Sequence, residues 1–140
     1  IVSVGGATGF AETNFGNKVE AAIRGLQDQD IVYLNVEGVE EISLKGNIDD
    51  KILTIEDIDS KVIGPLLKET SLNTDVKMMV VVNHMCSAVA VKYGKERVPF
   101  VISGRNGTSS VNKFDESLLD EGNNHFKSGP ELINMFFNVN

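Results

Sequence analysis

The side chains of this sequence with the greatest capacity for chemistry stand in two short segments, 37–41 and 83–86, each at the end of an apolar run. The first segment holds the carboxylates of Glu40 and Glu41, and the second holds the imidazole of His84. Carboxylate oxygens and imidazole nitrogens are ligands by which proteins hold divalent metals. A stable site generally uses three or more protein ligands, so a histidine hydrogen-bonded at a strand end is favoured over a metal site on these residues alone.

Three further side chains suggest a function, and each has a structural alternative. Lys18 could reach an anion held by the glycine-rich segment 5–9, but that segment lacks the Lys-Ser/Thr ending of a P-loop, and a tight turn explains its glycines as well. Arg105 could hold a phosphate or carboxylate or lie in a solvent-exposed turn. Cys86 stands two residues from His84. No third residue is seen to orient such a pair, so a half-buried structural cysteine is favoured over a nucleophile.

Two amphipathic helices are predicted to position these residues. Apolar residues recur at helical spacing within 16–28, after Asn14, which is a favoured cap residue. A longer helix is predicted over 47–68, where Asn47 can cap the first turn and isoleucine, valine and leucine form one apolar stripe. Pro65 stands late enough in this helix to kink or end it.

Apolar runs at 31–36, 76–82 and 98–103 predict strands of one sheet. The middle run is apolar on both faces, as strands of parallel sheets are. Short helices are predicted to close the chain at 114–119 and 130–137. The alternation of helices and strands predicts a three-layer α/β fold with a mostly parallel sheet flanked by helices. Ligands of such sheets lie beyond the carboxyl ends of the strands, which is where the carboxylates and the imidazole are expected.

Length, composition and charge limit the class of protein. The 140 residues fit a single domain, 1–140, and 41% hydrophobic residues supply a core. The net charge of −7 disfavours nucleic acid and anionic membranes as partners, and no apolar run approaches the roughly 20 residues that span a bilayer. One cysteine cannot form an internal disulfide, which is consistent with a reducing, cytoplasmic setting. Because the chain begins with Ile1 and not with Met, we expect it to be a piece of a longer protein.

Three stretches, in this order, resemble one family. They are GGATGFAETNFGNKVEAAI at 5–23, DIVYLNVEG at 30–38 followed by GNIDDKILTIEDIDSKVIGPLL, and VVVNHMCSAVAVKYGKERVPFVISG at 80–104. They are similar to the C-terminal part of the catalytic domain of archaeal-type cofactor-independent phosphoglycerate mutases, in the alkaline phosphatase superfamily. The resemblance implies an alkaline-phosphatase-like partial domain. It implies that intact members interconvert 2- and 3-phosphoglycerate with a serine nucleophile and two divalent ions, such as manganese, zinc or magnesium. That serine belongs to the family's N-terminal segment, so no catalytic residue is expected in this sequence.

The resemblance also implies metal ligands at five positions, few of which this sequence keeps. Where the family has an Asp and a His four residues apart, this chain has Glu40 and Leu44. Where the family has an Asp–His pair and a later His, this chain has Asn83, His84 and Tyr93. Leucine offers no ligand, the amide is neutral, and the phenol ionises only near pH ~10. We therefore expect no catalytic metal pair: Glu40, Asn83 and His84 are degenerate positions that should lie near one another, and Leu44 and Tyr93 are lost ligands.

Two functions of different classes remain open. The first is a phosphoglycerate-mutase-like chain that has lost catalysis and acts as a binding or scaffolding module. Its expected partner is its own N-terminal segment or a paralogue, and a homo-oligomer is possible. The second is a divergent metal-dependent phosphomutase or phosphotransferase, with ligands rebuilt from Glu40, Glu41, His84 and residues upstream. The metal content of the full-length protein discriminates between them.

Overall fold

A computed structural model describes most of the chain, namely residues 1–73, 75–104, 113–122 and 124–138. It divides into two compact units, each built from two stretches of sequence. The first, which we call the helical unit, comprises Ile1–Glu69 and Cys86–Gly94. The second, which we call the strand unit, comprises Thr70–Met85 and Lys95–Asn140. The single domain over 1–140 stays a prediction. None of the described helices is both long and apolar enough to cross a membrane.

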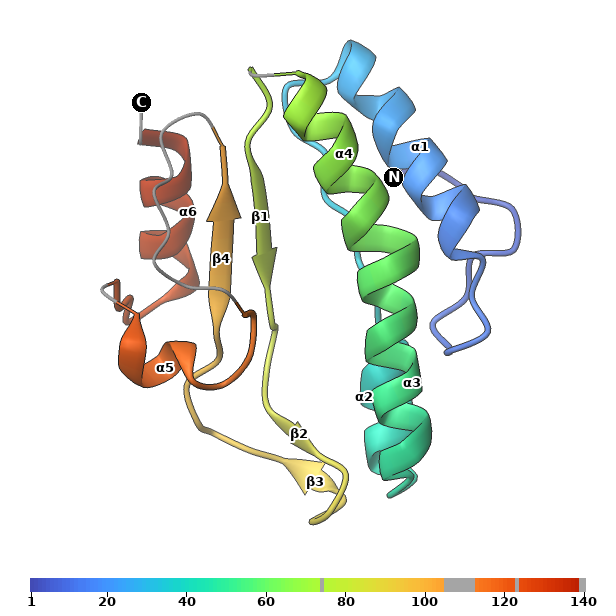
Figure 1. The fold of residues 1–140 in the computed structure, drawn as a ribbon, viewed down its shortest axis with the longest axis vertical. Helices are drawn as coiled ribbons and strands as arrows, with labels where there is room; N and C mark the ends of the chain where they lie inside the picture. The colour runs from blue at the N-terminus through green and yellow to red at the C-terminus, as the bar shows by residue number, and fades with distance from the viewer. Residues whose placement is uncertain (74, 105–112, 123, 139–140) are drawn as a thin grey trace. The chain divides into compact units, whose positions relative to one another are not determined.

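The first predicted helix is confirmed as α1, Phe15–Asp28 (Figure 1). Its cap is Asn14, whose side-chain oxygen accepts a hydrogen bond from the N–H of Asn17 at 2.9 Å. This bond satisfies one of the backbone donors that a helix leaves unpaired at its start. The inner face of α1 is buried through Phe15, Val19 and Ala22.

The long helix predicted over 47–68 is confirmed as a column of three elements (Figure 1). Asn47 caps it, accepting a hydrogen bond from the N–H of Asp50 at 3.0 Å. The column extends beyond the predicted end and consists of α3 (Ile48–Ile58), the π-helical turn η1 (Asp59–Ile63) and α4 (Gly64–Leu72).

Pro65 does not end this column, because the π turn precedes it. A proline inside an α-helix lacks its own N–H and crowds the carbonyl one turn earlier. Here the N–H of Gly64 bonds the carbonyl of Asp59, five residues back, which is the wider spacing of a π turn. The wider turn accommodates the proline, and Val62 within it is only 2% exposed.

The hydrophobic core of the helical unit lies between α1 and the helical column. Its buried residues are Phe15, Val19 and Val62. Half-buried side chains from α1, the column and the segment 31–36 pack against them: Ile23, Leu34, Val36, Ile58 and Leu66.

The segment 31–36 lies in the helical unit, and its predicted place in one sheet with the strands of the strand unit stays a prediction. It runs without described strand pairing. Its exposure alternates: Val32, Leu34 and Val36 are half-buried, whereas Ile31 is 61% and Tyr33 84% exposed. A sequence apolar at nearly every position therefore buries only one of its faces in the described structure.

The strand unit contains β1 (Met78–Val81) and β4 (Phe100–Ser103), which confirm the strands predicted near 76–82 and 98–103. The mostly parallel sheet requires correction, because β1 and β4 pair antiparallel, with Met79 opposite Ile102. A parallel pair needs a crossover of a dozen or more residues, usually helical. No helix lies between these strands. The chain instead returns through a hairpin of β2 (Cys86–Ser87) and β3 (Lys92–Tyr93), also antiparallel.

Two helices follow the strands in the strand unit. α5 (Leu118–Glu121) is shorter than the helix predicted over 114–119 and begins later. α6 (Gly129–Asn138) confirms the helix predicted over 130–137, with Pro130 in its first turn, where its missing N–H costs nothing. Mixed helices and strands thus confirm the α/β class.

Candidate functional site

The short helix α2 (Gly38–Leu44) carries the first predicted metal position, and its inner face is fixed closely. Gly38 packs where a side chain would not fit, since an added Cβ would lie 2.9 Å from the Cα of Ala11. Ser43 is fully buried, and its hydroxyl donates to the carbonyl of Val39 at 2.7 Å. The backbone of α2 is therefore held on one side, and its other side is available to present side chains.

That other side presents Glu40, and the structure joins it to Tyr93. The hydroxyl of Tyr93 donates to Oε1 of Glu40 at 2.6 Å, across 53 positions of sequence. Leu44 stands one helical turn after Glu40 and is 37% exposed. Two of the five positions that the resemblance assigns to metal ligands are thus in direct contact through a hydrogen bond.

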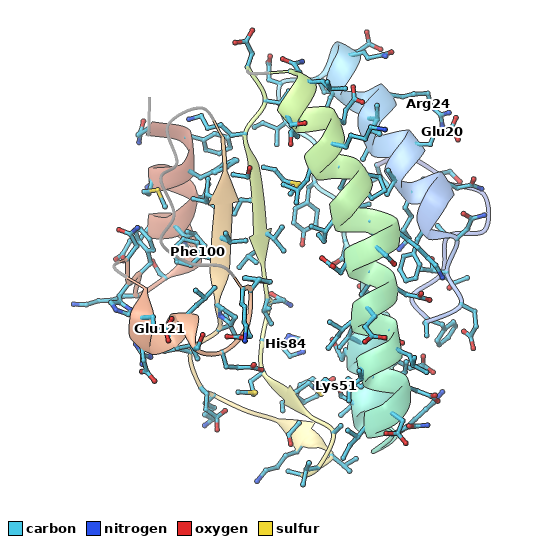
Figure 2. All side chains as sticks on the ribbon, in the orientation of Figure 1. Glu20, Arg24, Lys51, His84, Phe100 and Glu121 are labelled. Atoms are coloured by element: carbon cyan, nitrogen blue, oxygen red, sulfur yellow. The ribbon has the colours of Figure 1, made fainter. Side chains whose placement is uncertain are left out.

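The hairpin β2–β3 places Tyr93 opposite α2. Its register sets Cys86 opposite Tyr93, and the hairpin packs against α2. Lys51, on α3, donates from Nζ to the carbonyl of Cys86 at 2.8 Å, which fastens the hairpin to the helical column (Figure 2). Gly46, at φ +72°, brings the turn between α2 and α3 against Val91. The contact of Tyr93 with Glu40 therefore depends on elements anchored by other residues.

The bond to Glu40 also favours the protonated form of Tyr93. Chiefly through this hydrogen bond, and then through desolvation and the negative charge of Glu40, the pKa of Tyr93 is raised above its ordinary value. A phenol binds a divalent cation well only as phenolate, so the bond keeps Tyr93 in the form that is the poorer ligand.

Asn83 and His84 pair with each other in the strand unit. The amide nitrogen of Asn83 lies 3.1 Å from Nδ1 of His84. The two residues share one hydrogen bond, as the alternative of a hydrogen-bonded histidine at a strand end predicts. That they lie near Glu40 stays a prediction.

These residues do not fit a pair of divalent ions. Within the part of the chain that the structure describes, no three His, Cys, Asp or Glu side chains gather where they could hold a metal. Glu40 accepts a phenol proton, Leu44 has no donor atom, and Asn83 is neutral. No chemical step through a metal can be assigned to this chain's own residues.

The predicted anion-binding residues have structural contacts. Lys18 donates from Nζ to the carbonyls of Thr8 and Asn35, at 3.3 and 3.1 Å. In the glycine-rich loop, the N–H of Thr8 bonds the hydroxyl of Thr13 at 2.9 Å, and Gly6 has a positive φ of 73°. The loop forms a tight turn onto α1, as its structural alternative predicts. Arg105 lies outside the described residues.

Sequence reasoning missed Lys51 and the bond between Glu40 and Tyr93. Lys51 sits among isoleucines on a helix and gives no local signal of a partner 35 positions away. The sequence singled out Glu40 and Tyr93 separately, Glu40 as a degenerate metal position and Tyr93 as a lost ligand, and not as a pair. Their opposite hydrogen-bonding capacities, one acceptor and one donor, were the available signal.

Comparison with known proteins gives one consistent family. A model described as Metalloenzyme superfamily matches residues 1–129. Among curated relatives, the 2,3-bisphosphoglycerate-independent phosphoglycerate mutase of Methanosarcina acetivorans is 30% identical over 99% of this chain and 36% of its own length. That of Methanothrix thermoacetophila is 31% identical over 96% of this chain and 35% of its own length. A probable enzyme of this name from Geobacter sulfurreducens is 31% identical over 96% of this chain and 34% of its own length. The chain therefore spans about a third of the length of these relatives, which fits a partial, C-terminal domain.

A solved structure shares the fold. The structure of PH0037 protein from Pyrococcus horikoshii matches with a TM-score of 0.80 and 25% identity, over 87% of this chain and 37% of that one. Together with the family match, this confirms the predicted alkaline-phosphatase-like α/β class of partial domain.

Proposed function

The chain belongs to the Metalloenzyme superfamily, and we propose that it is a phosphoglycerate-mutase-like member that does not hold the catalytic metal pair by itself and acts as a binding or scaffolding module. The observation that carries this proposal is the 2.6 Å hydrogen bond between Glu40 and Tyr93. It joins two positions that the family resemblance assigns to metal ligands.

The hydrogen bond substitutes for a metal at these two positions. A divalent ion gives up part of its hydration shell on binding, and anionic oxygens or imidazole nitrogens must replace that water. The carboxylate of Glu40 already accepts a proton-bearing oxygen, and the raised pKa of Tyr93 further favours its protonated form. Ligation of a metal by Tyr93 itself would require loss of the phenol proton.

Charge gives a second reason. Two divalent cations at close range repel each other unless carboxylates neutralise them. Leu44 and Asn83 contribute no charge where the family resemblance expects an imidazole and a carboxylate. Glu41, the other carboxylate of α2, is engaged with Lys45 in an ion pair. Too little negative charge is therefore offered to a metal pair.

A binding role suits the remaining features. The chain matches about a third of the length of its relatives, so its expected partner is an N-terminal segment of its own protein or a paralogue. A net charge of −7 argues against nucleic acid and anionic membranes. A cytoplasmic setting is part of the same proposal, in keeping with a single cysteine.

Metal titration tests the proposal. Manganese and zinc are titrated by calorimetry into the purified chain and into a Leu44→His/Asn83→Asp/Tyr93→His variant, with Tyr93→Phe as control. We expect no tight, saturable binding to the wild type or to Tyr93→Phe, and gain of binding by the triple variant. Binding by Tyr93→Phe would mean that the Glu40–Tyr93 bond alone keeps metal out.

Binding of two ions by the wild-type chain would contradict the proposal. Binding of one ion, abolished in His84→Ala and in Glu40→Gln, would support the other function, a divergent metal-dependent phosphomutase or phosphotransferase. That function would require further ligands from outside this chain. Both outcomes are read directly from the stoichiometry of the titration.

A further inference from the structure

The hairpin β2–β3 contains little that would hold its shape without neighbours. Each of its strands has only two residues, and a two-stranded hairpin by itself is marginally stable in water. Its turn, 88–91, reads Ala-Val-Ala-Val and lacks the Gly, Asn, Asp and Pro residues that favour turns. Within the described hairpin, Ala88 alone is buried. The shape of the hairpin must therefore come from its contacts with other elements.

The backbone of the turn is strained at Val91. Its φ is +49°, a left-handed conformation that is a genuine outlier for a β-branched residue. Such a conformation persists only where the surrounding structure imposes it. Val91 lies against Gly46, where an added Cβ would stand 3.3 Å from a methyl group of the valine. The turn between α2 and α3 therefore holds Val91 in a conformation that the hairpin sequence does not favour.

Two hydrogen bonds hold the opposite end of the hairpin. Lys51 donates to the carbonyl of Cys86 at 2.8 Å, and Tyr93 donates to Glu40 at 2.6 Å. Cys86 and Tyr93 are cross-strand partners and form the pair farthest from the turn. These contacts and the one at Gly46 all lie within the helical unit, whereas the chain on both sides of the hairpin belongs to the strand unit. The hairpin is thus docked on the helical unit at both of its ends.

We propose that the hairpin 86–93 is a latch that is ordered only while it is docked on the helical unit, and that Lys51 is the residue that holds it there. Undocking separates Tyr93 from Glu40, so the bond between these two positions exists in the docked state alone. This inference rests on the proposed function and names a device that regulates its site. A ligand that prefers the undocked hairpin would shift the equilibrium by its difference in affinity for the two states.

Nuclear magnetic resonance relaxation dispersion on the metal-free chain tests the latch, because it measures the population of a minor state at the amides of 86–93. Lys51→Met should raise the undocked population about tenfold, as loss of a hydrogen bond to a charged group allows. The increase should be the same at Cys86 and at Tyr93, because the hairpin is released as one unit. Lys61→Met, which removes an exposed lysine from the same helical column, is the control and should leave the hairpin unchanged.

A pair of turn variants tests the strain. Val91→Asn supplies a residue that tolerates the left-handed conformation and should lower the undocked population several-fold. Val89→Asn makes the same change at an exposed position without a positive φ and should not lower it. Equal effects of the two variants would overturn the inference. So would a Lys51→Met variant with no common exchange process in the hairpin, or with a change confined to Cys86.

The latch and the proposed function can fail separately. The latch is measured without metal, through the dynamics of the hairpin, whereas the proposed function is tested by the stoichiometry of metal titration. A rigid hairpin in Lys51→Met together with no metal binding would contradict the latch alone. Release of the hairpin together with binding of two ions by the wild-type chain would contradict the proposed function and leave the latch standing.

Discussion

The helical unit and the strand unit bury their side chains to different degrees. Among the described residues, all those that are buried belong to the helical unit, including Phe15 at 5% and Val62 at 2% exposure. In the strand unit, aromatic packing is limited to contacts such as Phe100 with Phe126, whose ring centroids lie 5.6 Å apart. In the described structure the helical unit has a buried core, whereas the described side chains of the strand unit are at most half-buried.

The difference follows from the kinds of element in each unit. In the helical unit, α1 and the column from α3 to α4 offer two long apolar stripes that cover each other. In the strand unit, a sheet of two described strands has little surface to bury, and two strands alone are marginally stable in water. The helical unit should therefore dominate the measured stability, and substitutions should affect the two units unequally.

The largest expected effect is that of Phe15→Ala. Removing a buried aromatic ring costs about 3–5 kcal/mol, and Phe15 lies at the centre of the buried cluster. Urea unfolding monitored by amide exchange in α1 measures the change. Phe137→Ala in the strand unit is the matched control: that ring is 49% exposed and contacts Phe136, so a loss of about 1 kcal/mol is expected, well below that of Phe15→Ala. Equal losses in the two variants would remove the contrast between the units.

A smaller effect is expected from adding one methyl group to a glycine. Gly38→Ala would place its Cβ 2.9 Å from the Cα of Ala11, a backbone contact that cannot rotate away. Overpacking of this kind costs about 1–3 kcal/mol. Gly129→Ala, at the start of α6, meets nothing within 4 Å and should be neutral or slightly stabilising. Thermal unfolding of both variants measures the two changes in stability. If Gly38→Ala left the stability unchanged, α2 would not be tightly packed against Ala11.

The helices could be predicted because their signals are local. Asn14 and Asn47 both cap the helices that they precede, and the apolar spacing of the stripes locates α1 and α3. The π turn before Pro65 could not be predicted, because it reflects a balance between proline geometry and burial of Val62 that no local pattern records. The antiparallel pairing of β1 with β4 was missed for a similar reason: strand composition does not specify direction.

At the candidate site, residue identity was predictable and contact was not. Family resemblance singled out Glu40 and Tyr93, yet their hydrogen bond depends on a hairpin 53 positions away being fastened by Lys51. A contact of this kind can be predicted only when the arrangement of the hairpin, α2 and α3 in space is known. Lys18 also has contacts that the sequence did not predict: its ammonium group donates to two backbone carbonyls, while its role in binding an anion stays a prediction.

The smallest expected effects are those of pH, and they have opposite directions in the two units. In the helical unit, the pKa of Tyr93 is raised above its ordinary value of about 10, mainly by its hydrogen bond to Glu40. A raised pKa means that the folded state prefers the protonated phenol. The contribution of this bond to stability is therefore complete below about pH 10 and is lost as the pH rises through the pKa of the folded state. Above it, phenolate and carboxylate repel each other.

In the strand unit, the pKa of Asp115 is lowered below its ordinary value of about 4, because the hydroxyl and the N–H of Ser117 both donate to its carboxylate. This contribution is complete above about pH 4 and is lost as the pH falls through the lowered pKa. We expect alkaline titration to perturb nuclear magnetic resonance signals of the hairpin around Tyr93 before those of Ser117, and acid titration to do the reverse. Both groups are solvent-exposed, so each effect should be small.

Tyr93→Phe should abolish the alkaline transition and leave the acid transition unchanged, and Ser117→Ala should shift only the acid one. If Tyr93→Phe altered both transitions, the two units would not respond independently to pH, and the contrast between them would not extend to their electrostatics.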